Sequence, residues 1–304
     1  MGKTLSELKI GRYPPAVVAY PDTTILEVLK RMAEKWVRHS PIIEEKTGKV
    51  LGMVSARDLI NFLGGGPKHK IVEEKYDGDL YEALVNEPVC SIKYIPPTVS
   101  LNTKLYEVIN LMMGRNIGAL CVVDENDNLI GIISERHIIG LIESYHTLVK
   151  VSEIMSRPLI YLPPQANIIE CQRLMHKKHI RRVALKDEGG LKGIVTIKDI
   201  VKFYSKDETL EEMRRLGKEN VYNTPVYNIA TKGVVCINPE RDIGEAVEVM
   251  RKFNIGSLIV VNSKGENVGI ITERDYILKL PKIKGVEIFV DAQLRSIVVG
   301  RVYI

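Results

Sequence analysis

Gly269-Ile-Ile-Thr-Glu-Arg-Asp275 is the stretch from which the architecture follows, because the same pattern occurs four times in the chain. Each copy has a glycine, two apolar residues, a hydroxyl residue, two further positions and, in three copies, an acid. An apolar helical segment follows each copy. A regular repeat predicts one supersecondary unit that is used several times. The other copies are Gly52-Met-Val-Ser-Ala-Arg-Asp58, Gly131-Ile-Ile-Ser-Glu-Arg-His137 and Gly193-Ile-Val-Thr-Ile-Lys-Asp199.

A methionine upstream of each motif forms a second anchor of the repeat. It stands five residues before a β-branched residue, which precedes the motif glycine by 13 to 15 positions. The variation in length falls in polar turns such as Asp187-Glu-Gly-Gly190, where changes are tolerated better than in a core. The anchor pairs are Met32 and Val37, Met112 and Ile117, Met175 and Ile180, and Met250 and Ile255.

The fourth repeat shows the expected order of elements. Residues 234–237 predict a short strand, and apolar residues at helical spacing predict a helix between Pro239 and Asn254. Residues 258–261 and 268–271 predict two buried strands, and a helix is expected over 273–280. The unit is β-α-β-β-α, and the fold class is α/β (α+β). The first repeat predicts the same order, with strands at 17–20, 41–43 and 51–54 and helices over 25–32 and 57–62.

The repeats group in twos. Gly52 and Gly193 are 141 residues apart and Gly131 and Gly269 are 138 apart, whereas neighbouring motif glycines are 79, 62 and 76 apart. The longer period predicts two modules of two repeats, each with a polar helical insert between its halves. The predicted domains are repeat one at 4–63, repeat two at 84–143, repeat three at 149–204, repeat four at 222–280 and a C-terminal β extension at 281–304.

The C-terminal extension contains two β-like runs, at 286–290 and 297–304. They predict a hairpin that extends or covers a sheet. A contact strand for a partner or for a second copy of the chain is the alternative.

Composition limits the class of protein. With 304 residues, 45% of them hydrophobic and 27% charged, the chain is expected to be globular, with about two domains. No apolar run approaches the roughly 18 residues of a membrane span, and residues 1–8 show no secretory signal, so a cytoplasmic location is expected. The formal charge of +5 is a small surplus for a nucleic-acid binder, and it suits an anionic ligand equally well.

The sequence shows neither a metal motif nor a catalytic motif. Its four cysteines never form a C-x-x-C pair, and its six histidines lack ligand spacing. Nucleophile-elbow, phosphate-loop and dinucleotide motifs do not occur, so catalysis and a catalytic cofactor are not expected. Each cysteine lies in an apolar segment and is expected to be a buried thiol: Cys90, Cys121, Cys171 and Cys236.

These repeats resemble CBS domains, the repeat first defined in cystathionine β-synthase. Four motifs in register with their helices carry the resemblance, together with Val151-Ser-Glu-Ile-Met155 before the third repeat and strands that end in Val-Val-Asp124 and Val-Val-Asn262. In this family two repeats pair into a Bateman module, and tandems of four, as in the γ subunits of AMP-activated protein kinase, commonly form a disc. The resemblance implies adenosine-containing ligands in clefts between paired repeats and a regulatory role.

The motif places a hydroxyl at the end of a strand and an acid three residues later. This spacing matches a helix capping box, so capping alone explains any single copy. The N–H groups at a helix start also favour a phosphate. The resemblance implies that the acid holds the ribose hydroxyls. Carried over by position, Asp58, Asp199 and Asp275 would bind ribose, with Ser55, Thr196 and Thr272 near the sugar or phosphate.

The second repeat departs from the pattern, because His137 stands where the others have an acid. An imidazole cannot accept two ribose hydroxyls as a carboxylate can. This site is therefore expected to be empty, weakened or suited to another ligand, and two or three competent sites are expected rather than four. For His137 a packed or solvated ring and a phosphate contact are both open, and Ser134 is a weak candidate beside it.

Cations stand just before the second strand of the odd repeats. Arg38 and His39 occupy this place in repeat one, and Arg181 and Arg182 in repeat three, whereas the even repeats have glycine followed by alanine or serine. The resemblance implies phosphate binding by these four cations, with Lys178 as a weaker candidate. A solvated cation at a helix C-terminus is the alternative for each. The cations inside the motif are expected to be exposed: Arg57, Arg136, Lys198 and Arg274.

Adenine would need an apolar slot beside the first and second strands of a repeat. The candidates are Tyr20, Ile42, Val183 and Leu258, whose spacing is equally typical of core residues.

The leading hypothesis is a non-catalytic sensor that binds AMP, ADP or ATP and reports energy state to a regulated protein. S-adenosylmethionine or methylthioadenosine is the alternative ligand, although a sulfonium has no use for the arginines of the odd repeats. A nucleic-acid-associated protein, which the scarcity of aromatic residues disfavours, and a scaffold are the alternatives from other classes. A homodimer is a further hypothesis that rests on the resemblance.

Overall fold

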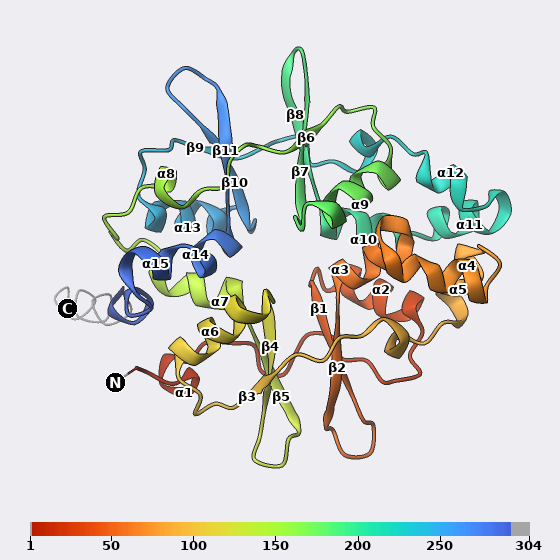
Figure 1. Cartoon of the computed structure of the whole chain (residues 1–304), viewed down its shortest axis with the longest axis horizontal. Helices are drawn as coiled ribbons and strands as arrows, with labels where there is room; N and C mark the ends of the chain where they lie inside the picture. Colours follow the sequence, from red (N-terminus) through yellow and green to blue (C-terminus); the bar gives the residue numbers. More distant parts are fainter. Residues whose placement is uncertain (1, 293–304) are drawn as a thin grey trace. The chain divides into compact units, whose positions relative to one another are not determined.

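The computed structural model describes residues 2–292 of the chain. Its four repeats have the predicted mixed α/β order (Figure 1). Repeat one contains α2 (Ile25–Glu34), β1 (His39–Ile43), β2 (Val50–Ser55), α3 (Ala56–Ile60) and η1 (Asn61–Gly65). Repeat two contains β3 (Thr98–Val99), α6 (Leu105–Arg115), β4 (Ala119–Val123), β5 (Leu129–Ser134), α7 (Glu135–Ile139) and η4 (Gly140–Ile142).

Repeats three and four follow the same plan. Repeat three contains β6 (Tyr161–Leu162), α9 (Ile168–Lys177), β7 (Arg182–Asp187), β8 (Gly190–Thr196) and α10 (Ile197–Tyr204). Repeat four contains β9 (Cys236–Ile237), α13 (Ile243–Lys252), β10 (Ser257–Val261), β11 (Asn267–Thr272) and α14 (Glu273–Leu278). The inserts after repeats one and three form η2 (Pro67–His69), α4 (Lys70–Lys75) and α5 (Leu80–Asn86), and α11 (Asp207–Leu216) and α12 (Lys218–Tyr222).

Each sheet is small. In repeats two, three and four a short first strand pairs in parallel with the second strand, which pairs antiparallel with the third. In repeat one the strand predicted at 17–20 is reduced to a single parallel bridge between Ala19 and Ile42, so its sheet has two strands, β1 and β2.

The C-terminal extension corrects one prediction. Helix α15 (Leu280–Lys284) follows repeat four, and residues 288–292 are helical, so the strand predicted at 286–290 is wrong. Phe289 and Ala292 are buried in the core of the same unit, one helical turn apart, which explains why helix wins over the local β preference. The second run, 297–304, lies outside the described residues.

The five-residue spacing between the anchor residues is explained by how the helices end. In each repeat the β-branched residue donates its N–H to the carbonyl of the anchor methionine, as in Val37 to Met32 at 3.0 Å and Ile255 to Met250 at 2.8 Å. This six-residue closure is a Schellman motif. It requires left-handed backbone one residue earlier, and that residue has positive φ in all four repeats: Trp36, Asn116, His179 and Asn254.

The described residues form two compact units, each with its own hydrophobic core. The first unit comprises the described residues within Met1–Pro14, Pro97–Leu159 and Val234–Ile304, and therefore holds repeats two and four. The second comprises Pro15–Pro96 and Ile160–Gly233, and holds repeats one and three. Each half of the chain thus contributes one repeat to each unit.

Helices join the two repeats of each unit. In the second unit α10 packs against α2 and α3 (Figure 1). Gln172 of α9, which accepts from the buried Tyr204 hydroxyl at 2.9 Å, donates to the Ile60 carbonyl of α3 at 3.4 Å. In the first unit α7 packs against α14, and Arg274 pairs with the fully buried Glu135 at 2.8 Å. The motif helices therefore carry the contacts between repeats.

The segment that leads into each repeat packs on the other repeat of the same half. The four lead-in segments (4–14, 88–96, 150–158 and 224–233) contain α1 (Leu5–Leu8), η3 (Val89–Ile92), α8 (Val151–Ile154) and η5 (Val226–Ile229). Each forms a bridge to the residue after a motif glycine: Arg12 to Ile132, Tyr94 to Met53, Ser156 to Ile270 and Thr231 to Ile194. The lead-in segments are therefore exchanged between repeats.

This exchange accounts for the motif glycine. A Cβ added at any of the four positions would lie too close to a lead-in carbonyl oxygen. At Gly52 it would lie 2.9 Å from Tyr94 O, at Gly193 2.9 Å from Thr231 O, and at Gly269 2.6 Å from Ser156 O. A Cβ added at Gly131 would lie 2.9 Å from Arg12 O. Real Cβ atoms do not approach so closely, so only glycine lets the exchanged segment pack here.

The cysteine prediction is correct for two residues. Cys121 and Cys171 are buried, and burial raises the pKa of each thiol to about 12. Cys90 is half-buried and Cys236 is exposed, so the prediction that all four are buried is wrong. Cys236 belongs to β9, a two-residue edge strand whose other residue, Ile237, provides the buried face. Among residues 2–292, helices long and apolar enough to cross a membrane do not occur.

Candidate functional site

The motif acids cap the helices that follow them. In repeat three Asp199 Oδ2 accepts hydrogen bonds from the Thr196 backbone N–H and hydroxyl, both at 2.7 Å. Asp275 Oδ2 accepts the same pair from Thr272 at 2.8 and 2.7 Å, and Asp58 Oδ2 accepts it from Ser55 at 2.9 and 2.5 Å. The capping role is therefore present in all three copies, and it uses one carboxylate oxygen.

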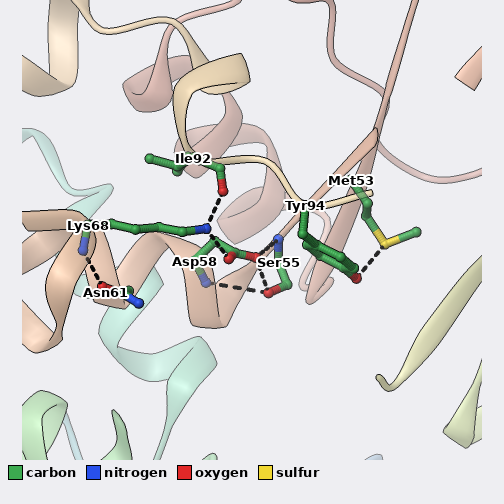
Figure 2. A network of polar contacts seen from close by, with 7 residues as sticks. All are labelled: Met53, Ser55, Asp58, Asn61, Lys68, Ile92 and Tyr94. Atoms are coloured by element: carbon green, nitrogen blue, oxygen red, sulfur yellow. Dashed lines mark hydrogen bonds and ion pairs between the residues drawn. The ribbon is translucent and has the colours of Figure 1, made fainter. Parts of the chain in front are cut away.

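The other carboxylate oxygen distinguishes the three copies. Asp58 Oδ1 pairs with the Lys68 ammonium (Figure 2). Asp275 Oδ1 accepts from the Ser156 hydroxyl at 2.6 Å and pairs with Lys279 at 2.7 Å. Asp199 Oδ1 accepts no hydrogen bond from any residue that the structure describes. Repeat three thus presents a carboxylate oxygen to which no residue between 2 and 292 donates.

The electrostatics of Asp199 follow from its surroundings. Burial is the largest influence and raises the pKa of this carboxyl above its ordinary value of 3.8, against the Thr196 hydrogen bonds and the charges of Lys198 and Lys202, which lower it. Burial destabilises the ionised form of this carboxyl. A ligand that donates hydrogen bonds to the carboxylate would stabilise that form.

His137 takes the capping place of the acid in repeat two. Its Nδ1 lies 3.1 Å from the Ser134 backbone nitrogen and 3.2 Å from the Ser134 hydroxyl. The nitrogen must accept the backbone N–H, so this ring nitrogen serves the cap. The cap uses only this ring nitrogen, and a phosphate contact by Nε2 of His137 stays a prediction.

The predicted phosphate-binding residues lie beside the motif. In β1 His39 is the register partner of Ser55, and in β7 Arg182 is the partner of Thr196. The carbonyl of Arg38 accepts from Ala56 N at 2.8 Å, and that of Arg181 from Ile197 N at 2.9 Å, so both arginines adjoin the first residue of a motif helix.

The two units differ in the charge of these positions. All four predicted cations belong to the second unit, whereas Gly118 and Gly256 stand at the place of Arg38 and Arg181 in the first. Lys178, the weaker candidate, caps the C-terminus of α9 and is exposed.

The predicted adenine contacts divide by burial. Ile42, Val183 and Leu258 have no exposed surface and pack in the hydrophobic cores, whereas Tyr20 is 36% exposed. Strand alternation cannot separate core from pocket in the sequence, since both require apolar side chains. The structure gives the three buried residues a packing role and leaves Tyr20 accessible.

The cations inside the motif are half-buried, whereas they were expected to be exposed. Arg274 bonds to Asn116, and Arg136 donates to Asn254 Oδ1 at 2.7 Å, so each reaches the helix end of the other repeat. Lys198 lies 4.2 Å from the centre of the Trp36 ring. Arg57 is half-buried. Arg274, Arg136 and Lys198 therefore contact the other repeat of the same unit, which a sequence pattern within one repeat cannot reveal.

Two residues near the motif carboxylates were not predicted from the sequence. Lys279 follows Asp275 by four positions, a spacing at which opposite charges meet on a helix and which could have indicated it. Lys68 follows Asp58 by ten positions across a helix break, and no local pattern indicates that contact. Among the described residues, groups of three or more His, Cys, Asp or Glu placed to hold a metal ion are not found.

Comparison with known proteins agrees with this architecture. The family model of the CBS domain matches residues 10–65, 91–144, 151–206 and 226–282. The chain is 44% identical over 298 residues to an uncharacterized 33.4 kDa protein in the ribosomal RNA operon of Thermofilum pendens, a match that covers 98% of this chain and 99% of that protein. It is 28% identical over 270 residues to protein MJ1225 of Methanocaldococcus jannaschii, with 88% and 96% covered.

The crystal structure of MJ1225, for which homology to the γ subunit of AMP-activated protein kinase has been suggested, has a TM-score of 0.81 against this chain at 27% identity. The match covers 89% of this chain and 98% of that one. Inosine-5'-monophosphate dehydrogenase of Aquifex aeolicus is 36% identical over only 109 residues, 22% of that enzyme. The chain belongs to the CBS-domain family and carries four CBS domains, organised as in a double Bateman module.

Proposed function

We propose that this protein is a non-catalytic, cytoplasmic regulator that binds AMP, ADP or ATP and senses the energy state of the cell. Family membership and the similarity to MJ1225, for which homology to the kinase γ subunit has been suggested, support a regulatory role. The ribose would be held by Asp199, with Thr196 near the sugar or phosphate. Arg181, Arg182, Arg38 and His39 would hold phosphate.

One observation carries the proposal. Asp199 is capped through Oδ2, its Oδ1 accepts no hydrogen bond from the described residues, and Arg182 lies opposite Thr196 on the neighbouring strand. Ribose hydroxyls are donors that suit the first group, and phosphate oxygens are acceptors that suit the second. An adenine nucleotide offers both within one molecule.

Charge favours a phosphate ligand over a sulfonium ligand. Two arginines adjoin the motif of repeat three, and a third adjoins that of repeat one. S-adenosylmethionine carries a positive sulfonium that these side chains would repel, whereas a phosphate would pair with a guanidinium fork. The regulated protein would respond only if the nucleotide binds two shapes of the sensor with different affinity.

Isothermal titration calorimetry of nucleotide-free protein with AMP, ADP, ATP and S-adenosylmethionine tests the proposal. Saturable binding of an adenine nucleotide should be lost in Asp199→Asn and weakened at least about tenfold in Arg182→Met, because each removes one charged partner of the ligand. Asp207→Asn, which removes an exposed carboxylate on α11, is the matched control and should bind normally. Binding of S-adenosylmethionine alone, or no binding at all, would contradict an energy sensor.

A further inference from the structure

Two lysines meet the motif carboxylates in the same way although they come from different parts of the repeat. Lys68 lies in η2, beyond a break in the helix, whereas Lys279 ends α14 itself. Each pairs with Oδ1 of its aspartate, which is the oxygen that the helix cap does not use. The Lys68 backbone is held in place by Asn61 Oδ1, which accepts from its N–H at 2.7 Å (Figure 2).

Both lysines also donate to the exchanged lead-in segment. Lys68 Nζ bonds to the carbonyl of Ile92, and Lys279 Nζ donates to the carbonyl of Ile154 at 2.9 Å. These two carbonyls are equivalent, because each stands two residues before the residue that bridges to the motif strand. Unrelated sequence positions therefore place an ammonium at one common point between the motif acid and the lead-in backbone.

This point is the place where a ribose would have to bind. The Asp58 and Asp275 side chains are only 14% and 5% exposed, so water can replace little of what the lysines supply. A ribose that takes Oδ1 must displace the ammonium from both the carboxylate and the carbonyl. Displacing the ammonium costs free energy, because partly buried polar groups lose a charged partner. The hydrogen bonds of the ligand would have to offset that cost.

Repeat three lacks this arrangement. Phe203 stands four residues after Asp199, where repeat four has Lys279, and Thr209 stands ten residues after it, where repeat one has Lys68. Ile229 provides the equivalent lead-in carbonyl. Among the described residues, none donates to Asp199 Oδ1, so the same geometry is present without the ammonium.

We propose that Lys68 and Lys279 determine which CBS sites bind nucleotide: they close the carboxylates of repeats one and four to ribose and leave Asp199 as the high-affinity site. This inference rests on the proposed function and narrows it to one tight site. The closed repeats keep their motif acids because those acids still cap helices and hold the lead-in segments.

Moving the lysine into repeat three tests the proposal directly. Phe203→Lys should weaken the binding of AMP or ATP at least about tenfold, because the new ammonium can reach Asp199 Oδ1 and the Ile229 carbonyl. Phe203→Met, which shortens the aromatic side chain without adding a charge, is the matched control and should bind as the unaltered protein does. Equal binding by both variants would overturn the proposal.

Removing the lysines provides the converse test. Lys68→Met, and Lys279→Met combined with Ser156→Ala, whose hydroxyl also donates to Asp275 Oδ1 at 2.6 Å, should each add a calorimetric binding site or tighten a weak one at least about tenfold. The gain should disappear when Asp58→Asn or Asp275→Asn is added. Lys68→Gln serves if the methionine variant does not fold, and Lys206→Met, at an exposed position, is the control. Unchanged stoichiometry and affinity in both repeats would overturn the proposal.

The outcomes distinguish a failure of the proposed lysine role from a failure of the proposed nucleotide binding. If the unaltered protein binds nucleotide through Asp199 and the lysine variants bind identically, the role of the lysines fails and the sensor function stands. If Asp58→Asn or Asp275→Asn alone abolishes tight binding, those sites are open and the role of the lysines again fails. If none of the proteins binds an adenine nucleotide, the proposed function fails, and the role of the lysines fails with it.

Discussion

Asp199 shows how one residue can serve both a fold and a ligand. Its Oδ2 atom completes a helix cap, and its Oδ1 atom stays without a donor among the described residues. The sequence predicted the cap and the acid, because both depend on residues three positions apart. It could not distinguish Asp199 from Asp58 and Asp275, because that difference depends on Lys68, Lys279 and Ser156 arriving from elsewhere.

Asp199→Asn should stabilise the ligand-free protein at neutral pH. Since burial raises the folded-state pKa of this carboxyl, the protonated form stabilises the fold at low pH, and that contribution is lost as pH rises through the folded pKa. The asparagine oxygen can still accept from Thr196 and carries no charge. The melting temperature of the variant relative to the unaltered protein should therefore increase as pH rises above 3.8, the ordinary pKa of the carboxyl, toward neutrality.

Asp58→Asn is the control for this measurement. It should lower the melting temperature at pH 7, because Lys68 loses its ionic partner. An Asp199→Asn variant that is less stable than the unaltered protein across the whole pH range would contradict the expectation.

The motif strands and the lead-in segments illustrate how elements acquire their partners. The glycine of each motif was visible in the sequence, yet its reason was not, because a Cβ there would meet a carbonyl from a segment of the other repeat. The order of strands and helices could be predicted from periodicity, a local property. The exchange of lead-in segments depends on contacts between residues 37 to 120 positions apart, such as Tyr94 with Met53 and Arg12 with Ile132.

Gly193→Ala should lower the free energy of unfolding by about 1 to 3 kcal/mol, since the added methyl would stand 2.9 Å from Thr231 O and force the lead-in segment outward. Urea denaturation measures the loss, and faster hydrogen exchange of the Thr231 amide, which donates to Ile194 O at 3.0 Å, locates it. Gly233→Ala, in the same segment but with open space around the added Cβ, is the control. Equal stability of the two variants would contradict the close-approach explanation.

Arg274→Met should be one of the most destabilising substitutions in the contact between α7 and α14. It removes a partner from Glu135, which has no exposed surface, and breaking such a buried pair costs about 3 to 5 kcal/mol. The double variant Glu135→Gln with Arg274→Met should recover part of the loss, because residue 135 then carries no buried charge. Urea denaturation that shows a loss below about 1 kcal/mol for the single variant would contradict this account.

Each compact unit draws its core from both halves of the chain. In the second unit α10 of repeat three packs on α2 and α3 of repeat one, and in the first unit α14 of repeat four packs on α7 of repeat two. A cut between Leu148 and Val149 would leave every exchanged lead-in segment with its partner repeat. It would separate the helix faces that meet around Gln172 and Glu135.

Fragments 1–148 and 149–304 should therefore associate when they are produced together. The apolar helix faces of each fragment have their partners in the other one, and buried apolar surface drives association. Size-exclusion chromatography with light scattering should find a one-to-one complex. Adding Gln172→Leu should weaken it, because Gln172 Nε2 donates to the carbonyls of Ile60 and Leu63 in the other fragment at 3.4 and 3.3 Å. Fragments that remain separate monomers would contradict the assignment of the units.

Properties that depend on neighbours in the chain could be derived from the amino-acid order alone: four repeats, the β-α-β-β-α unit, the recurring five-residue spacing of Met32 and Val37, and the Thr196 to Asp199 cap. Their physical causes, periodicity and capping, act over a few residues. The pairing of repeats within a unit and the exchange of lead-in segments depend on the tertiary structure. So does the contrast between Asp199 and the lysine-bound Asp58 and Asp275. Those features arise from close packing and from the reach of single side chains across chain-distant segments, which local pattern does not encode.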